Sequence, residues 1–165
     1  MALAPMLSAL ERLIQLHDSL LKLSLQKTEY LKKGELTSLQ AVLKTENKHV
    51  QAINTFEKKR LNALKDWAVK KDITADQITV TLLLEQLEQE SEDYRQVERL
   101  STKLASILVD LKAQEALNQQ LTEQSLHFVQ VQLDMAAPSI EQVNYGHKQS
   151  QNDPSVKRSV FDSKA

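Results

Sequence analysis

Cysteine is absent from this chain of 165 residues, and glycine and proline are nearly absent. Without thiols the chain cannot form disulfides, zinc–thiolate sites or a cysteine nucleophile. Neither glycine nor proline occurs between Gly34 and Pro138. Because hairpins and tight turns depend on these two residues, a β-rich fold is disfavoured. The abundant Leu, Ala, Gln, Glu and Lys are good helix formers and favour an all-α protein.

Long apolar runs and a strong net charge are also missing. Runs such as Leu82-Leu83-Leu84 are far shorter than the roughly 18 apolar residues of a membrane span. The formal net charge of −1 argues against non-specific electrostatic binding of nucleic acid. The residues from Met1 to Pro5 lack the positive segment that opens a signal peptide. We therefore expect a cytoplasmic protein with no membrane span and no nucleic-acid partner.

Two helices joined by a very short link are predicted for the first part of the chain. From Met6 to Gly34, apolar residues recur at spacings of three and four in two neighbouring rows, which form a stripe wide enough for two neighbours. Gly34 is typical of a left-handed helix end, and a second helix to about Lys71 must then fold back antiparallel. Its predicted inner face comprises Leu36, Leu39, Leu43, Val50, Ile53, Leu64 and Trp67.

A third helix is predicted to start at the capping-box pattern of Thr74 to Gln77 and to meet no breaker before Pro138. Unbroken, it would extend about 90 Å, against about 45 and 55 Å for the first two. It therefore either breaks near Lys112–Asn118 and folds back, or ends in an arm. We expect an antiparallel bundle of three long helices, with a fourth if the third breaks. The bundle would occupy residues 1–137, and the polar residues 138–165 would form a flexible tail.

The segment from Leu117 to Met135 has two apolar stripes when drawn as a helix. The first comprises Leu117, Leu121, Phe128, Val131 and Met135, and the second, on the opposite side, comprises Leu126, Val129 and Leu133. A surface helix of a monomer needs one such stripe, and an exposed second one is typical of an interface. One hypothesis is that one stripe packs on the bundle and the other receives a partner's helix. The alternative is that both are buried within a four-helix monomer.

Two parts of the chain resemble the FlgN family of flagellar type III export chaperones. The first is the hairpin Leu20-Leu21-Lys22 … Lys27 … Tyr30-Leu31-Lys32-Lys33-Gly34-Glu35-Leu36 … Leu39 … Leu43 … Glu46. The second is Leu117-Asn118 … Ser125-Leu126-His127-Phe128-Val129-Gln130 … Leu133-Asp134-Met135, followed by a proline and Asn144-Tyr145-Gly146. The resemblance covers about residues 7 to 146.

The resemblance implies a bacterial cytoplasmic chaperone, not an enzyme, that needs no cofactor. Such a chaperone binds the C-terminal helical segment of hook–filament junction (hook-associated) proteins, prevents early assembly and delivers them to the cytoplasmic domain of the export gate. Tyr145 matches the residue that docks on the gate. The protein would be a monomer or weak dimer. The candidate client-binding residues are Leu117, Leu121, Leu126, Phe128, Val129 and Leu133.

Two other functions stay open. A structural coiled-coil protein would homo-oligomerise through the same wide stripes. A metal carrier is suggested by Glu46-x-x-His49, with His17 near it across the hairpin, but a di-iron bundle site needs two such pairs and two further glutamates. We therefore predict no metal site and interpret these histidines as surface or rim residues.

Overall fold

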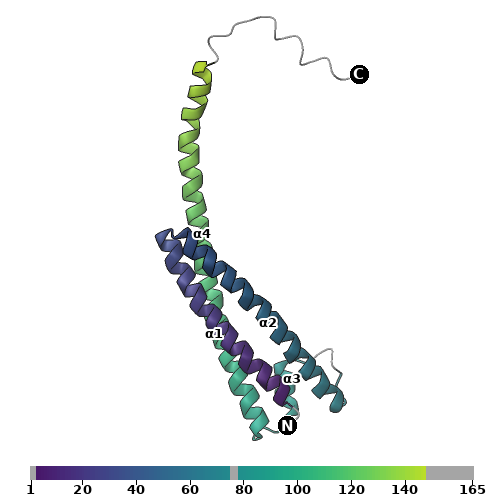
Figure 1. Ribbon diagram of the computed structural model, residues 1–165. Coiled ribbons are helices and arrows are strands. Elements are labelled where there is room, and N and C mark those ends of the chain that lie inside the picture. The colour runs from purple at the N-terminus through teal and green to yellow at the C-terminus, as the bar shows by residue number, and fades with distance from the viewer. Residues whose placement is uncertain (1–2, 75–77, 148–165) are drawn as a thin grey trace, which may run out of the picture. The chain divides into compact units, whose positions relative to one another are not determined.

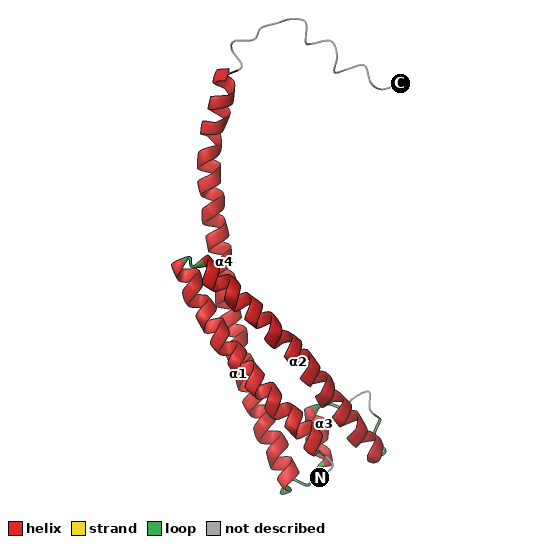
Figure 2. Ribbon diagram, in the orientation of Figure 1, coloured by secondary structure: helices red, strands yellow, loops and turns green. Residues whose placement is uncertain are grey.

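The computed structural model describes residues 3–74 and 78–147, with side chains up to Ala136. These residues form four α-helices and contain no β-strand, which confirms the predicted all-α class (Figures 1 and 2). The helices are α1 (Ala4–Lys33), α2 (Leu36–Lys70), α3 (Val80–Gln86) and α4 (Glu92–His147). The chain divides into two compact units, Met1–Thr122 and Glu123–Ala165.

The hairpin of α1 and α2 follows the prediction within about two residues at each end. Pro5 lies in the first turn of α1, where its missing N–H is not needed. Gly34 has φ +70°, and its N–H bonds to the carbonyl of Tyr30. A Cβ added at Gly34 would meet nothing within 4 Å, so the left-handed backbone alone explains this glycine. Figure 2 shows the two helices folding back from this link.

The predicted third helix starts later than expected and is interrupted between Gln86 and Glu92, at a place that the sequence analysis did not indicate. Residues 75–77 of the expected capping box lie outside the described residues, and the helix begins at Val80, capped by the Thr79 hydroxyl on the Leu82 N–H. The chain leaves the helix at Leu87 and re-enters at Glu92. The Ser91 hydroxyl accepts from the Tyr94 N–H at this new start. Of the two alternatives for Lys112–Asn118, a break or a continuous helix, the structure has the continuous helix.

The hydrophobic core of the first unit lies where α3 meets the ends of the other helices. Buried side chains come from the start of α1, the end of α2, α3 and the start of α4. They are Leu3, Met6, Leu7, Leu10, Ile14, Leu64, Trp67, Ala68, Leu83, Val97 and Leu100. Figure 1 shows α3 at this end of the first unit, near the N-terminus. The seven-residue α3 thus closes the core with Leu83, which is fully buried.

The opposite end of the hairpin is less apolar than predicted. Leu36, Leu43 and Val50, which were assigned to the inner face of α2, are exposed. Val42 and Glu46 are buried instead. The inward face of α2 is therefore displaced from the predicted row, because it follows a polar contact with α1 that apolar periodicity does not reveal.

The predicted boundary at Pro138 is not a helix end, because α4 continues to His147. Proline inside a helix removes one hydrogen bond, here to the carbonyl of Asp134, and disfavours the helix. Good helix formers surround it, including Ala136, Ala137 and Glu141, and these favour continuation. The rest of the expected tail, residues 148–165, lies outside the described residues.

Replacing Leu83 with Ala should destabilise the first unit by about 2–5 kcal/mol, because it empties a closed part of the core. Fluorescence of Trp67, the single tryptophan of the chain, during urea unfolding measures the change. Val69→Ala, at an exposed position on α2, is the control and should change stability by less than about 0.5 kcal/mol. Equal effects of the two substitutions would contradict the role of α3 in the core.

Candidate protein-binding site

The six candidate client-binding residues all lie on α4 but fall in both units. Leu117 and Leu121 belong to the first unit, where Leu117 is exposed and Leu121 is half-buried. The other four, Leu126, Phe128, Val129 and Leu133, belong to the second unit and are exposed. The sequence therefore located a helix with uncovered apolar side chains, although the two ends of the predicted site differ in their surroundings.

Both apolar stripes of the second unit are uncovered. The exposed fractions are 65% for Leu126, 52% for Val129 and 61% for Leu133. On the other stripe, Phe128 is 63% and Met135 72% exposed. Within the second unit, therefore, neither stripe is covered by other described residues of that unit.

A polar cluster, which the sequence analysis missed, joins α1 to α4 before this exposed segment begins. The Asn118 side chain is buried, and its Nδ2 donates to the Ser24 carbonyl at 2.9 Å and to Ser24 Oγ at 3.0 Å. The Thr28 hydroxyl donates to Asn118 Oδ1 and accepts from Gln114 Nε2. Because these bonds need matched partners on both helices, they fix one register of α4 against α1.

Lys27 adds α2 to this cluster and so connects three helices. Its Nζ lies 2.9 Å from Glu46 Oε1 on α2 and 2.9 Å from Glu115 Oε2 on α4. Glu115 also accepts from the Ser24 hydroxyl. Burial acts to lower the pKa of Lys27, but hydrogen bonds and charges from Glu115 and Glu46 outweigh it, so the pKa is raised above 10.5. The ammonium is therefore held in its charged form between two carboxylates.

The signal for this cluster was present in the heptad positions. Val97, Leu104, Leu111 and Asn118 follow one another at intervals of seven residues, so Asn118 occupies a core position. On α1 the row that begins with Leu7 and Leu10 continues at the same spacings to Ser24 and Thr28. In the sequence, such a cluster is visible only as polar residues within an otherwise apolar row. The hydrogen-bond partner of each polar residue could not be inferred from one helix alone.

The residues considered for a metal have other partners. Glu46 pairs with Lys27. The His49 ring lies between the Thr45 carbonyl at Nδ1 and the Ser19 hydroxyl at Nε2, each at 2.9 Å, and His17 Nδ1 lies 2.8 Å from the Leu13 carbonyl. Among the described residues, no three His, Asp or Glu side chains are grouped so that they could hold a metal ion.

Tyr145, the candidate for docking on the export gate, lies in the last turns of α4. Its side chain is beyond those that the structure describes, so its proposed contact rests on the sequence. The helical backbone at Tyr145 replaces the tail that was expected there.

Replacing Lys27 with Met should lower stability by about 2 kcal/mol, because it leaves two carboxylates without their cation. Lys22→Met, which removes only an exposed pair with Asp18, should cost less than about 0.5 kcal/mol. Thermal unfolding followed by circular dichroism measures both changes. Adding Glu46→Leu and Glu115→Leu to the Lys27 variant should restore most of the loss.

The pH dependence of the Lys27 contribution gives a second readout. The folded-state pKa is raised above 10.5, so the contribution is complete below 10.5 and is lost as the pH rises through the folded value. The stability difference between wild type and the Met variant should therefore be constant from neutral pH to about 10.5. It should shrink as the pH rises further, through the folded-state pKa of Lys27. A difference that already shrinks at neutral pH would contradict this assignment.

Comparison with known proteins agrees with the predicted resemblance. The sequence profile described as "FlgN protein" matches residues 1–153. A Bacillus subtilis (strain 168) protein named "Uncharacterized protein YvyG" is 31% identical over 169 residues, which span 100% of both chains. No solved structure matches the chain significantly.

Within the described residues, no helix has a stretch long and apolar enough to cross a membrane. FlgN proteins are chaperones rather than enzymes, and the match covers nearly the whole chain. The chain is thus a member of the FlgN family.

Proposed function

We propose that this protein is a bacterial cytoplasmic chaperone for flagellar type III export. Its clients are the hook–filament junction proteins, which it binds through their C-terminal helical segments before they assemble. The single observation that carries this proposal is the exposure of apolar side chains along α4 from Leu126 to Met135. A helix with two uncovered stripes is suited to receive amphipathic helices from another molecule.

The energy for binding comes from covering these stripes. A fully buried Leu, Val or Phe side chain contributes about 1.5–3 kcal/mol relative to its exposed state. A client helix laid along Leu126, Val129 and Leu133 covers one stripe, and a second segment of the same client covers Phe128 and Met135. A total buried area of about 1,500 Å² is ordinary for a stable complex. The proposed mechanism uses no cofactor.

Capture of the client also explains how early assembly is prevented. The apolar terminus of a junction protein is the surface through which it would meet other subunits. While α4 covers that surface, self-association is blocked. Release then needs only a competing partner at the export gate, for which Tyr145 is the proposed docking residue.

A structural protein that homo-oligomerises is the second candidate, and the same uncovered stripes favour it. Light scattering distinguishes the two. A chaperone should be a monomer or weak dimer that forms a discrete complex with a client. A stable oligomer that excludes clients would support the alternative.

Changing Leu126, Val129 and Leu133 together to Ser should weaken client binding about 1,000-fold, since three side chains lose at least 1.5 kcal/mol each. Thermal stability should stay within about 1 kcal/mol, because all three side chains are already exposed. Calorimetric titration with purified C-terminal segments of junction proteins measures the affinity.

The matched control changes Leu36 and Val69, which are equally exposed but lie on α2, to Ser. This control should bind clients as wild type does. Unfolding of the Leu126/Val129/Leu133 variant, or unchanged affinity for clients, would contradict the proposed site.

Tyr145→Ala should leave client affinity unchanged and reduce the amount of junction protein exported. Its control is Tyr145→Phe, which keeps the ring. Quantifying junction proteins in the medium of a flagellated strain, beside titration with the client segment, separates the two steps. Loss of client binding in the Ala variant would show that Tyr145 belongs to the client site instead.

A further inference from the structure

The second stripe of α4, which lies within Leu126–Leu133, has an acidic line along one flank. Asp134 and Glu141 follow Glu123 by 11 and 18 residues, which is about three and five helical turns. The three residues therefore lie on one line of the helix, about a quarter turn from the centre of the stripe. The side chains of Glu123 and Asp134 are exposed. One edge of the stripe is thus bordered by carboxylates.

The opposite flank of the stripe carries no charge. Ser125 and Gln132 lie there, about a quarter turn from the centre on the other side. No Lys or Arg occurs from Ala113 to His147, although the chain has 21 of these residues. The segment that carries the stripe therefore supplies no lysine or arginine to balance its carboxylates.

Asp134 adds hydrogen-bond acceptors to the acidic flank. Its Oδ1 accepts from Gln130 Nε2, an uncharged donor, at 3.2 Å. Its backbone carbonyl loses the helical partner that residue 138 would supply, because Pro138 has no N–H. Lys and Arg side chains carry several donors and no acceptor, so they match a flank with a surplus of acceptors.

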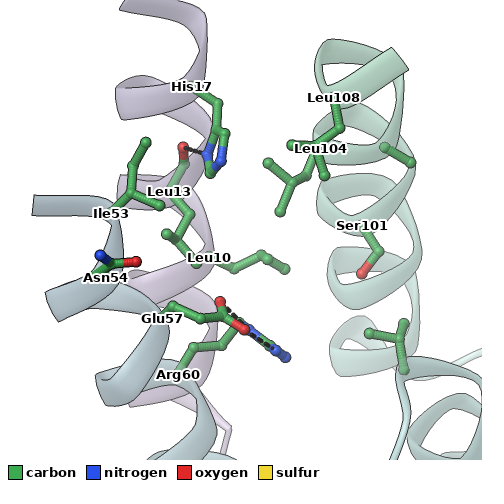
Figure 3. Close-up of a pocket in the computed structure, with 12 residues that line it drawn as sticks. Leu10, Leu13, His17, Ile53, Asn54, Glu57, Arg60, Ser101, Leu104 and Leu108 are labelled. Carbon is green, nitrogen blue, oxygen red and sulfur yellow. Dashed lines mark hydrogen bonds and ion pairs between the residues drawn. The ribbon is translucent and has the colours of Figure 1, made fainter. Parts of the chain in front are cut away.

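The groove between α2 and α4 in the first unit, another uncovered apolar surface, shows no such preference (Figure 3). Leu10, Leu13 and Leu104 line it, together with Arg60 and Glu57. The Arg60 guanidinium donates to the Glu57 carboxylate through hydrogen bonds of 2.9 and 2.6 Å. Because these two charges already pair with each other, they do not indicate the charge of an occupant. The flank of the second stripe does.

A second copy of this chain is a poor occupant of the stripe. Two copies paired antiparallel through it would set acidic flank against acidic flank, and two paired parallel would set acidic flank against neutral flank. Neither arrangement brings a lysine or arginine to the carboxylates, since residues 113–147 contain none. Like charges that face each other across an interface oppose association. A partner with its own cations is therefore favoured over self-association.

We propose that the second stripe takes an amphipathic client helix that carries Lys or Arg along one edge of its apolar face. This inference rests on the proposed function and specifies the chemistry of the client segment. The apolar row of the client covers the stripe, and its cations lie beside the acidic flank. Charge pairs at the rim of an interface act chiefly on the association rate and on discrimination between partners. The acidic flank thus selects among helices that have similar apolar rows.

Three synthetic peptides test this charge preference. They share one apolar row at helical spacing and carry Lys, Gln or Glu along one edge of it. At an ionic strength of about 0.05 M, wild type should bind the Lys peptide about tenfold more tightly than the Glu peptide, and the Gln peptide should lie between them. At about 0.5 M the difference should fall below about twofold, because salt screens exposed charges. Calorimetric titration measures the three affinities.

Glu123→Gln combined with Asp134→Asn should remove most of the preference. The matched control is Glu98→Gln with Asp110→Asn, which changes exposed residues of the same types on α4 in the first unit, and it should keep the preference. Both variants preserve side-chain size at exposed positions, so circular dichroism should show wild-type folding. Glu123→Lys combined with Asp134→Lys should make the Glu peptide the tighter ligand.

Equal binding of the three peptides by wild type would overturn the inference, and so would an undiminished preference in the Glu123/Asp134 amide variant. Lys157→Gln with Arg158→Gln in the full chain tests the chain's own C-terminal residues as the occupant. Tighter binding of the Lys peptide by that variant would assign the stripe to residues 148–165 and overturn the inference. A dimer that the Lys peptide dissociates, seen by light scattering, would assign the stripe to a second copy and also overturn it.

C-terminal segments of junction proteins separate this inference from the proposed function. Binding of such segments that is equal for wild type and the Glu123/Asp134 amide variant at low salt would refute the inference alone. Failure of wild type to bind any of these segments would refute the proposed function, whatever the synthetic peptides do.

Discussion

The apolar side chains of α4 contribute to a core in the first unit and lie exposed in the second. In the first unit, α1 and α3 bury Val97 and Leu100 and close a compact core. From Leu126 to Met135 the same helix presents apolar side chains to solvent on two sides. Exposed apolar surface of this kind is unfavourable in water. Contact with another molecule would bury it and lower the free energy. The stability of the hairpin and the proposed binding of clients thus depend on different parts of one helix.

The polar cluster around Lys27 separates these two parts. Apolar packing alone would let α4 slide along α1 by a turn at small cost, because leucine rows repeat. The bonds of Asn118 to Ser24 and Thr28 need one register, and Lys27 couples that register to Glu46 on α2. A cluster of this kind gives up some stability relative to an apolar layer and gains a unique arrangement. The position at which α4 leaves the first unit is thereby fixed.

The groove between α2 and α4 lies in the first unit, where α3 ends at Gln86 and Leu10, Leu13 and Leu104 line an open space. The fold therefore offers apolar surface at two places of different geometry: a concave groove in the hairpin unit and a convex helix beyond it.

The sequence by itself determined the helical class, the hairpin and the apolar segment near the end of α4. Glycine and proline are scarce, Gly34 marks the turn, and the spacing of Leu126, Val129 and Leu133 needs no partner to be recognised. Only the tertiary structure decided where the third helix breaks, since Leu87 to Ser91 contains neither glycine nor proline. It also decided that Glu46 rather than Leu43 faces inward, and that Leu126, Val129 and Leu133 are exposed in the second unit. The physical reason is that periodicity reports what one helix could bury, whereas burial depends on which partner helices reach it.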